Sequence, residues 1–245
     1  MNTIAIVEAR MSSNRLPGKV LLEAAGKTML EHLIDRLRAV PLISKILIAT
    51  TTNQADDVIQ QFAMKNKVTC YRGSEDDVMQ RVIDAGESVA ADVIVSITAD
   101  CPIIDPKIVE QMIRMFFANN VDYISNGHIR SYPDGMDCRI FHLKTLKRSA
   151  NMTFDKLDHE HVTLHIRNHP ELFSHIYLLA PPDLHWPELG LTLDEISDYN
   201  FLKKIIEHFY SQKKYLFDCR DVIELMKNKK KWPTINKDVI RKGNT

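Results

Sequence analysis

The stretch Thr3–Leu21, "TIAIVEARMSSNRLPGKVL", joins a short apolar run to a polar, basic segment. The run Ile4–Val7 consists mainly of β-branched residues and is followed by Glu8, which is typical of a strand leaving a protein interior. The segment after it holds three cations around a Pro-Gly pair: Arg10, Arg15, Lys19, Pro17 and Gly18. We predict a buried strand that ends in a loop, which is either a solvated turn or a pocket for a polyanion.

Apolar strand-like runs alternate with helical patterns through the first 120 residues. After the first strand, the predicted strands are Lys45–Thr50, Val68–Tyr71 and Asp92–Thr98. The predicted helices are Met29–Val40, Asp56–Asn66, Asp76–Ala91 and Pro106–Asn119. Apolar strands that alternate with helices predict a mostly parallel sheet covered on both faces, a three-layer α/β/α fold.

The pattern is less regular in the second half of the chain. Strand-like pieces at Asp122–Ser125, Cys138–Phe141 and His175–Ala180 alternate with His-rich stretches, followed by helical patterns at Ser197–Phe209 and Asp218–Lys227. We interpret residues 121–190 as a small inserted lobe, after which the chain returns to the core at Leu191–Glu195. The prediction is one domain, residues 1–245, divided into a core of residues 1–120, the lobe, and a return with C-terminal helices over residues 191–245.

Composition excludes several classes of protein. Lys+Arg and Asp+Glu both number 32, so the chain lacks the basic excess of a nucleic-acid or membrane-surface binder. Its four cysteines are far apart, which excludes a disulfide framework and a Cys-based zinc site. Neither a secretory signal nor an apolar run of about 20 residues is present, so we expect a cytoplasmic protein without membrane or nucleic-acid partners.

The polar loops after the strands are expected to share one edge of the sheet. In open parallel sheets, ligands bind at the carboxyl ends of the strands. The basic loop, Thr50–Gln54 and Thr98–Pro102 all follow predicted strands. Arginine binds phosphate oxygens through forked hydrogen bonds and lysine adds a point charge, so this edge suits a triphosphate. The chain has no GxxxxGK[ST] motif at the loop, which disfavours an ordinary ATPase.

Two aspartates are candidate ligands for a hard metal ion. Asp100 and Asp194 both follow apolar runs, and Mg²⁺ takes one or two carboxylates together with phosphate oxygens. Each aspartate has an alternative role as a helix N-cap. Asp105 is better placed to cap the helix at Pro106, and Glu195 and Asp198 compete with Asp194 as ligands.

Two further motifs leave their roles open. His161 and His165 lie four apart, as in a helical zinc site, but Val162 replaces the glutamate of HExxH, which favours a polar face or substrate binding. The segment "YPDGMDCR" reads as a Pro-Asp-Gly turn before a strand. Its Asp134 and Asp137 either belong to the turn or point into the substrate pocket.

Residues 9–21, "ARMSSNRLPGKVL", resemble the R-x-x-S-x-R-L-P-G-K signature of cytidylyltransferases that activate acidic sugars. The similarity is greatest to the SpsF-like branch, named for spore coat polysaccharide biosynthesis, which is related to CMP-Kdo and CMP-sialate synthetases. Further matches cover most of the chain: "GKTMLEHLIDRL" (26–37), "YRGSEDDVMQRV" (71–82), "ITADCPIIDP" (97–106), "PDGMD" (133–137), "EHVTLHIRNHPE" (160–171), "LTLDEISDY" (191–199) and "INKDVIRKG" (235–243).

The resemblance implies a nucleotide-diphospho-sugar transferase-like fold of the GT-A or Rossmann-like type, CTP as donor, Mg²⁺ as cofactor and a homodimer. It implies an acceptor-binding or dimerisation role for the lobe. The resemblance places four residues at the triphosphate: Arg10, Ser13, Arg15 and Lys19. We add Thr98, at the end of a predicted strand, to the predicted nucleotide-binding residues. Those near base and ribose are Arg72, Ser74, Asp77 and Arg81; those at the metal are Asp100 and Asp194; those near the acceptor are Asp134, Asp137, His161 and Arg167.

Two departures from the family pattern concern the acceptor. Gly190 stands where relatives often carry arginine, and Cys138–Arg139 stand where an acidic residue is common. The hypothesis is transfer of CMP from CTP to an acidic sugar of the 2-keto-3-deoxy type, with release of pyrophosphate, for surface polysaccharide synthesis. Arg10, Arg15, Lys19 and Asp100 are the predicted catalytic residues. Alternatives are a non-sugar acceptor such as an aminoalkyl phosphonate, and a glycosyl-transferring relative that binds a nucleotide-sugar.

Overall fold

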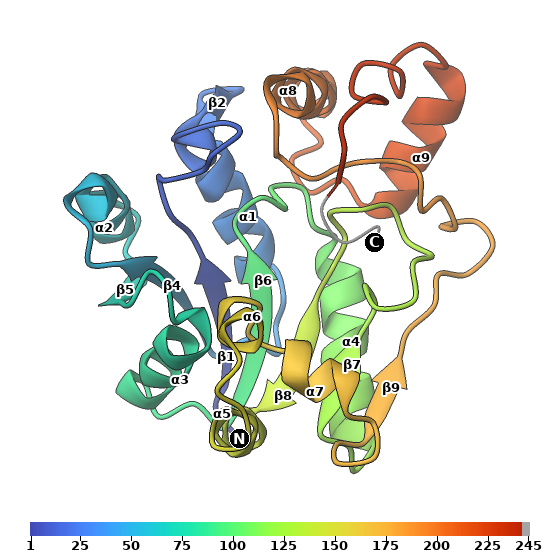
Figure 1. The fold of residues 1–245 in the computed structure, drawn as a ribbon. Helices are drawn as coiled ribbons and strands as arrows, with labels where there is room; N and C mark the ends of the chain where they lie inside the picture. Colours follow the sequence, from blue (N-terminus) through green and yellow to red (C-terminus); the bar gives the residue numbers. More distant parts are fainter. Residues whose placement is uncertain (242–245) are drawn as a thin grey trace.

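The computed structural model describes residues 1–241, and its centre is a seven-stranded sheet (Figure 1). The strand order is β5-β4-β1-β6-β8-β7-β9. The strands are β1 Thr3–Glu8, β4 Lys45–Thr51, β5 Thr69–Gly73, β6 Val93–Thr98, β7 Tyr123–Ser125, β8 Arg139–His142 and β9 His175–Tyr177. Two short strands, β2 Glu23–Ala24 and β3 Lys27–Thr28, form a separate hairpin.

Strand β1 lies at the centre of the parallel part of the sheet because both of its faces are apolar. Ile4 and Ile6 face one helical layer, and Ala5 and Val7 face the other. All four side chains are fully buried. The strand pairs in parallel with β4 on one side and β6 on the other, so that Glu8 lies beside Thr98. The basic loop therefore leaves the sheet where β6 also ends.

Helices cover both faces of the sheet (Figure 1). One layer consists of α1 Met29–Arg38, α2 Asp57–Lys65, α4 Pro106–Ala118, α8 Ile196–Ser211 and α9 Cys219–Asn228. The opposite layer consists of α3 Val78–Ser88, α5 Leu143–Ala150 and α7 Leu164–Asn168, with α6 Lys156–Glu160 beside α3. The predicted α/β/α architecture is confirmed. The helices and strands begin and end within a few residues of the predicted positions.

Side-chain caps fix the starts of several helices. Asp105 accepts a hydrogen bond from the amide of Lys107 at 2.8 Å, so it caps α4 as predicted. At α8 the cap is Glu195, whose partner Asp198 completes a capping box. Neither Asp100 nor Asp194 caps a helix, and both carboxylates remain available at the sheet edge.

Residues 121–190 do not build a sheet of their own. Their three strands extend the central sheet beyond β6, because β8 pairs antiparallel with β6 and with β7, while β9 pairs parallel with β7. Strand β8 alone runs against the others. The predicted lobe is therefore continuous with the core, and its division from residues 1–120 as a functional unit stays a prediction.

Two connections on the pocket side contain short 3₁₀ helices. Lys19–Leu21 form the 3₁₀ helix η1 and Gln54–Asp56 form η2. Within residues 1–241, no helix combines the length and the apolar character needed to cross a membrane.

Candidate active site

A pocket of about 340 Å³ opens at the carboxyl ends of β1 and β6. The basic loop contributes Arg10, Ser13, Arg15 and Lys19, and the end of β6 contributes Thr98 and Asp100. Other segments supply Glu8, Arg81, Glu160, His161 and Asp194. Segments from five parts of the sequence thus meet at this edge of the sheet, which is where open α/β sheets bind ligands.

Lys19 lies between the two predicted metal-binding aspartates. Its Nζ is 3.0 Å from Asp194 Oδ1 and 3.4 Å from Asp100 Oδ2. Burial lowers the pKa of Lys19, but Asp100 and then Asp194 outweigh it, and on balance the pKa is raised. The lysine is therefore firmly cationic, and two carboxylates converge on one positive charge.

Backbone pairing explains why these distant carboxylates meet. The amide of Leu193 donates to the carbonyl of Asp100 at 2.8 Å, which places the return segment against the end of β6. Thr98 Oγ1 donates to Asp100 Oδ1 at 2.5 Å and orients that carboxylate. The amide of Asp194 donates to Asp198 at 3.1 Å, so the capping box of α8 also fixes Asp194.

Arg15 forms a second link between the basic loop and the return segment. One of its guanidinium nitrogens lies 2.9 Å from Asp194 Oδ1, and another lies 3.6 Å from Glu195. Arg10 is more exposed and pairs with Glu75 at 3.5 Å. Together with Lys19, these side chains make one wall of the pocket cationic, as phosphate binding requires.

A buried carboxylate holds the start of the basic loop. Asp56, only 1% exposed, accepts from the amide of Met11 at 2.7 Å and from the hydroxyl of Thr51. The loop then closes on itself, because the amide of Gly18 donates to the carbonyl of Met11 at 3.0 Å. Gly18 has a φ of 71°, a conformation that favours glycine. This contact could not be predicted from the sequence, because Asp56 and Met11 lie 45 residues apart in the chain.

Glu8 contributes an acidic group to the floor of the pocket. Burial raises its pKa, while Arg139, Arg81 and a 3.1 Å hydrogen bond from Ser96 oppose that shift. Arg81 points from α3 toward the same space, and its buried Nε has no hydrogen-bond partner within residues 1–241. Sequence reasoning missed Glu8 because its position at the end of a strand did not distinguish it from a surface residue.

Three residues predicted to lie near the base and ribose make hydrogen bonds to the backbone. Arg72 pairs with Asp57 at 2.6 Å and donates to two backbone carbonyls, which ties β5 to α2. Ser74 accepts from the amide of Asp77, which in turn caps α3. None of Arg72, Ser74 and Asp77 lines the pocket, whereas Arg81 does.

Only one of the four residues predicted near the acceptor lines the pocket. His161 lines it directly. Asp134 is buried and forms an isolated parallel β-bridge with Gly190. Its carboxylate pairs with Arg130 at 3.5 Å. Burial, then the charge of Asp134, raises the pKa of Asp137 to about 6. Arg167, in α7, is not among the residues that line the pocket.

The two histidines of the excluded zinc motif are not on one helix. His161 ends α6, Val162 adopts a φ of 47°, and His165 belongs to α7. His165 is buried and its Nδ1 lies 3.0 Å from the hydroxyl of Ser149. The helical i, i+4 arrangement considered from the sequence is therefore wrong, and His161 alone reaches the pocket.

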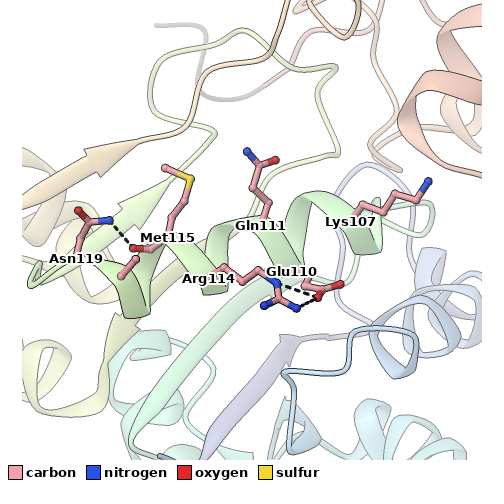
Figure 2. A pocket seen from close by; sticks show the side chains of 7 residues that line it. Lys107, Glu110, Gln111, Arg114, Met115 and Asn119 are labelled. Atoms are coloured by element: carbon pink, nitrogen blue, oxygen red, sulfur yellow. Dashed lines mark hydrogen bonds and ion pairs between the residues drawn. The ribbon is translucent and has the colours of Figure 1, made fainter.

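A second cavity, of about 430 Å³, lies along the outer surface of α4 (Figure 2). Its lining includes Lys107, Gln111 and Met115, with Arg114 paired to Glu110 at 2.5 Å. All of its lining residues come from one stretch of helix and its C-cap, and it contains none of the predicted site residues. The pocket at β1 and β6 is therefore the candidate active site.

The sequence profile of the cytidylyltransferase family matches residues 4–227. The chain belongs to this family. It is similar to the spore coat polysaccharide biosynthesis protein SpsF of Bacillus subtilis, with 34% identity over 84% of this chain and 88% of the relative. A solved cytidylyltransferase structure from Leptospira borgpetersenii matches with a TM-score of 0.90 and 31% identity, covering 98% of this chain and 99% of that one. A 3-deoxy-manno-octulosonate cytidylyltransferase of Trichlorobacter lovleyi is 33% identical over 49% of this chain and 46% of its own length.

This cytidylyltransferase is therefore a CTP-dependent enzyme with the fold of nucleotide-sugar-type nucleotidyltransferases, as the sequence predicted. Its basic loop and the start of η1 supply the cationic wall of the pocket. The acceptor and the metal are not fixed by membership of the family.

Proposed function

We propose that the chain transfers CMP from CTP to an acidic sugar of the 2-keto-3-deoxy type, releasing pyrophosphate, in the synthesis of a surface polysaccharide. The observation that supports this most is the contact of Lys19 with both Asp100 and Asp194 beside Arg15. Such an arrangement combines cations for phosphate oxygens with paired carboxylates for a metal ion.

The proposed reaction needs little covalent work from the protein. An acceptor hydroxyl oxygen would form a bond to the α-phosphorus while the bond from that phosphorus to pyrophosphate breaks, and the hydroxyl proton passes to solvent. Lys19 and Arg15 would bind phosphate oxygens and stabilise the charge that accumulates on the leaving pyrophosphate. The pocket walls would hold the acceptor in line with the breaking bond.

Asp100 and Asp194 fit a Mg²⁺ ion by their chemistry and placement. Both carboxylates approach the Lys19 ammonium, so their oxygens already surround a cation position. Residues 1–241 hold no cluster of three or more His, Cys, Asp or Glu side chains suited to a metal. Two carboxylates plus substrate phosphates are the usual ligands of Mg²⁺, whereas zinc requires more protein ligands. When bound, Mg²⁺ would neutralise charge on the phosphates of CTP.

A cation close to the pocket residue Glu8 would suit an anionic sugar. Arg139 begins β8, where burial lowers its pKa but Tyr123, Asp137 and Glu8 raise it on balance. A permanently charged guanidinium is the side chain best suited to a carboxylate. His161 adds a ring that can donate or accept a hydrogen bond from an acceptor hydroxyl. The proposal also includes a homodimer located in the cytoplasm.

Pyrophosphate release measured with each of the four nucleoside triphosphates and a panel of acceptors tests the proposal. We expect turnover with CTP, Mg²⁺ and a 2-keto-3-deoxy sugar acid, and little turnover with ATP, GTP or UTP. Turnover only with an aminoalkyl phosphonate would replace the sugar acceptor. Hydrolysis or transfer from a CMP-sugar without use of CTP would contradict the proposal.

Two substitutions separate the phosphate and metal roles. Asp100→Asn should abolish most Mg²⁺-dependent activity, and near-full activity in this variant would refute its assignment to the metal. Lys19→Ala should lose activity while remaining folded. Lys107→Ala is the matched control, because Lys107 makes a surface ion pair with Asp218 far from the pocket.

A further inference from the structure

The C-terminal segment of the described chain runs against the active-site wall. The carbonyl of Ile240 accepts a hydrogen bond from Arg15 at 2.8 Å. Asn236 is buried and donates to the carbonyl of Gly190 at 3.0 Å and to Asp198 at 2.7 Å. Residues 236–241 therefore contact both the phosphate-binding side chain and the segment that carries Asp194.

Arg241 makes the largest set of these contacts. Its guanidinium donates to Asp198 Oδ1 at 3.0 Å and to the hydroxyl of Thr192 at 2.9 Å. Its Nε lies 3.6 Å from Asp134 Oδ2. The Arg241 side chain is only 10% exposed, and the Asp134 and Asp198 side chains are 8% and 0% exposed. Because these side chains are shielded from solvent, removing one of them leaves the charge of its partner buried and uncompensated.

Asp198 connects Arg241 to the candidate metal site. Its Oδ2 accepts from the amides of Asp194 and Glu195, at 3.1 and 2.9 Å. Its Oδ1 accepts from Asn236 and Arg241. One oxygen thus holds the backbone of Asp194, while the other is fixed by the C-terminal segment. A shift of Asp198 would move the Asp194 carboxylate.

Gly190 provides the space in which this guanidinium lies. A Cβ built at position 190 would stand 1.8 Å from Nη2 of Arg241, closer than any non-bonded contact allows. Gly190 is not among the glycines with a positive φ in residues 1–241, so its backbone conformation does not itself require glycine. The missing side chain at 190 therefore accommodates Arg241.

We propose that Arg241 is a positioning residue of the active site, which orients Asp194 through Asp198 for binding of a divalent cation with CTP. The inference rests on the proposed metal site at Asp100 and Asp194. It adds a fourth stretch of sequence, residues 236–241, to the segments that determine the geometry of that site. Mutation of a group that orients a metal ligand commonly lowers metal affinity by about 10- to 100-fold.

Binding of Mn²⁺ to the full-length protein in the presence of CTP, followed by electron paramagnetic resonance, tests this role without requiring turnover. We expect Arg241→Ala to weaken Mn²⁺ binding by roughly 10-fold or more. Arg241→Lys keeps the positive charge but loses the forked donors of the guanidinium, so it should recover part of the Mn²⁺ affinity. Lys237→Ala is the matched control, because Lys237 is exposed and should bind Mn²⁺ like the wild type.

Gly190→Ala tests the same contact from the other side, because its methyl group displaces the guanidinium without removing any charged group. Gly190→Ala should weaken Mn²⁺ binding as Arg241→Ala does. If Arg241→Ala fails to fold, the Mn²⁺ affinities of Gly190→Ala and Arg241→Lys test the role of Arg241. Wild-type affinity in folded Arg241→Ala, or in both other variants, would overturn the proposal. So would an absence of Mn²⁺ binding by the wild type with CTP.

The proposed reaction can fail separately. A wild type that binds Mn²⁺ with CTP but transfers CMP to no tested acceptor would refute the proposed acceptor class. The comparison of Mn²⁺ affinities between wild type and variants would still decide the role of Arg241.

Discussion

Replacing Lys19 by methionine should have opposite effects on stability and on divalent-cation binding. The ammonium of Lys19 contacts both Asp100 and Asp194, and its side chain is only 12% exposed. Methionine keeps much of the apolar stem but removes the charge. The two carboxylates would then face each other without that counter-charge, although Arg15 would still contact Asp194.

The size of the effect follows from burial and distance. Breaking a fully buried ion pair costs about 3–5 kcal/mol, and the Asp194 and Asp100 side chains are 17% and 26% exposed, so a cost of about 2 kcal/mol is expected. In a chain of this length, that corresponds to a fall in Tm of about 4–8 °C. A unit charge about 4 Å away contributes up to about 4 kcal/mol at an effective dielectric constant of 20. Removing it should therefore strengthen Mn²⁺ binding without nucleotide by about 10-fold or more.

Thermal unfolding with and without millimolar Mn²⁺ measures both effects, and pyrophosphate release measures the loss of charge stabilisation. Lys19→Met should start at a lower Tm, gain more from Mn²⁺ than the wild type, and lose about 100-fold or more in turnover. Lys107→Met is the control, because its exposed pair with Asp218 contributes about 1 kcal/mol or less. An unchanged Tm together with a wild-type response to Mn²⁺ would refute the reasoning.

Three other substitutions test separate features. Burial raises the pKa of Asp137 from 3.8 to about 6, so its ionisation opposes folding as the pH rises through that range; Asp137→Asn should stabilise the protein at about pH 8 by on the order of 3 kcal/mol, with little gain at about pH 4 in urea unfolding. A hydrogen bond to Asp77 raises the pKa of His159, so that contact stabilises below about pH 6.5 and is lost as the pH rises through the raised value; His159→Gln should lower Tm more at about pH 5 than at about pH 8. Gly135 has a φ of 106° and its added Cβ would lie 2.6 Å from the backbone of Leu191, so Gly135→Ala should cost about 3 kcal/mol in urea unfolding.

The strands with apolar side chains on both faces could be predicted from the sequence. Strands β1, β4 and β6 lie where the apolar runs place them, because a buried parallel strand needs apolar side chains on both faces. Strand β8 was expected as an extended piece, but its antiparallel place in the main sheet was not. Pairing between distant strands depends on tertiary contacts that a local pattern does not contain.

The candidate site could be predicted where its residues follow strand ends. Lys19 and Asp100 follow β1 and β6, which are parallel and end at the same edge. Asp194 reaches them on a return segment that is not a strand but bonds to the carbonyl of Asp100. Arg72 seemed equally suited to a ligand, yet its guanidinium binds backbone carbonyls and Asp57. Composition and spacing cannot distinguish these two uses of an arginine.

The contribution of Arg241 could not be predicted, because it depends on where the C-terminal segment passes. A local signal was nevertheless present in Gly190, whose lack of a side chain was noted only as a departure from relatives. The structure relates the two positions, since the guanidinium of Arg241 lies where a side chain at 190 would begin.

The reversed direction of β8 has a consequence for how acceptor choice can change. Because β7 ends at Ser125 and β8 begins at Arg139, residues 126–138 leave and re-enter the sheet at one edge, the edge at which β6 ends. The loops that carry Lys19 and Asp100 lie elsewhere in the chain. Within this segment, Asp134 bridges Gly190 and lies 3.6 Å from Arg241. We therefore expect that exchanging residues 126–138 between relatives requires matching residues at these two positions, whereas the loops that carry Lys19 and Asp100 can stay unchanged.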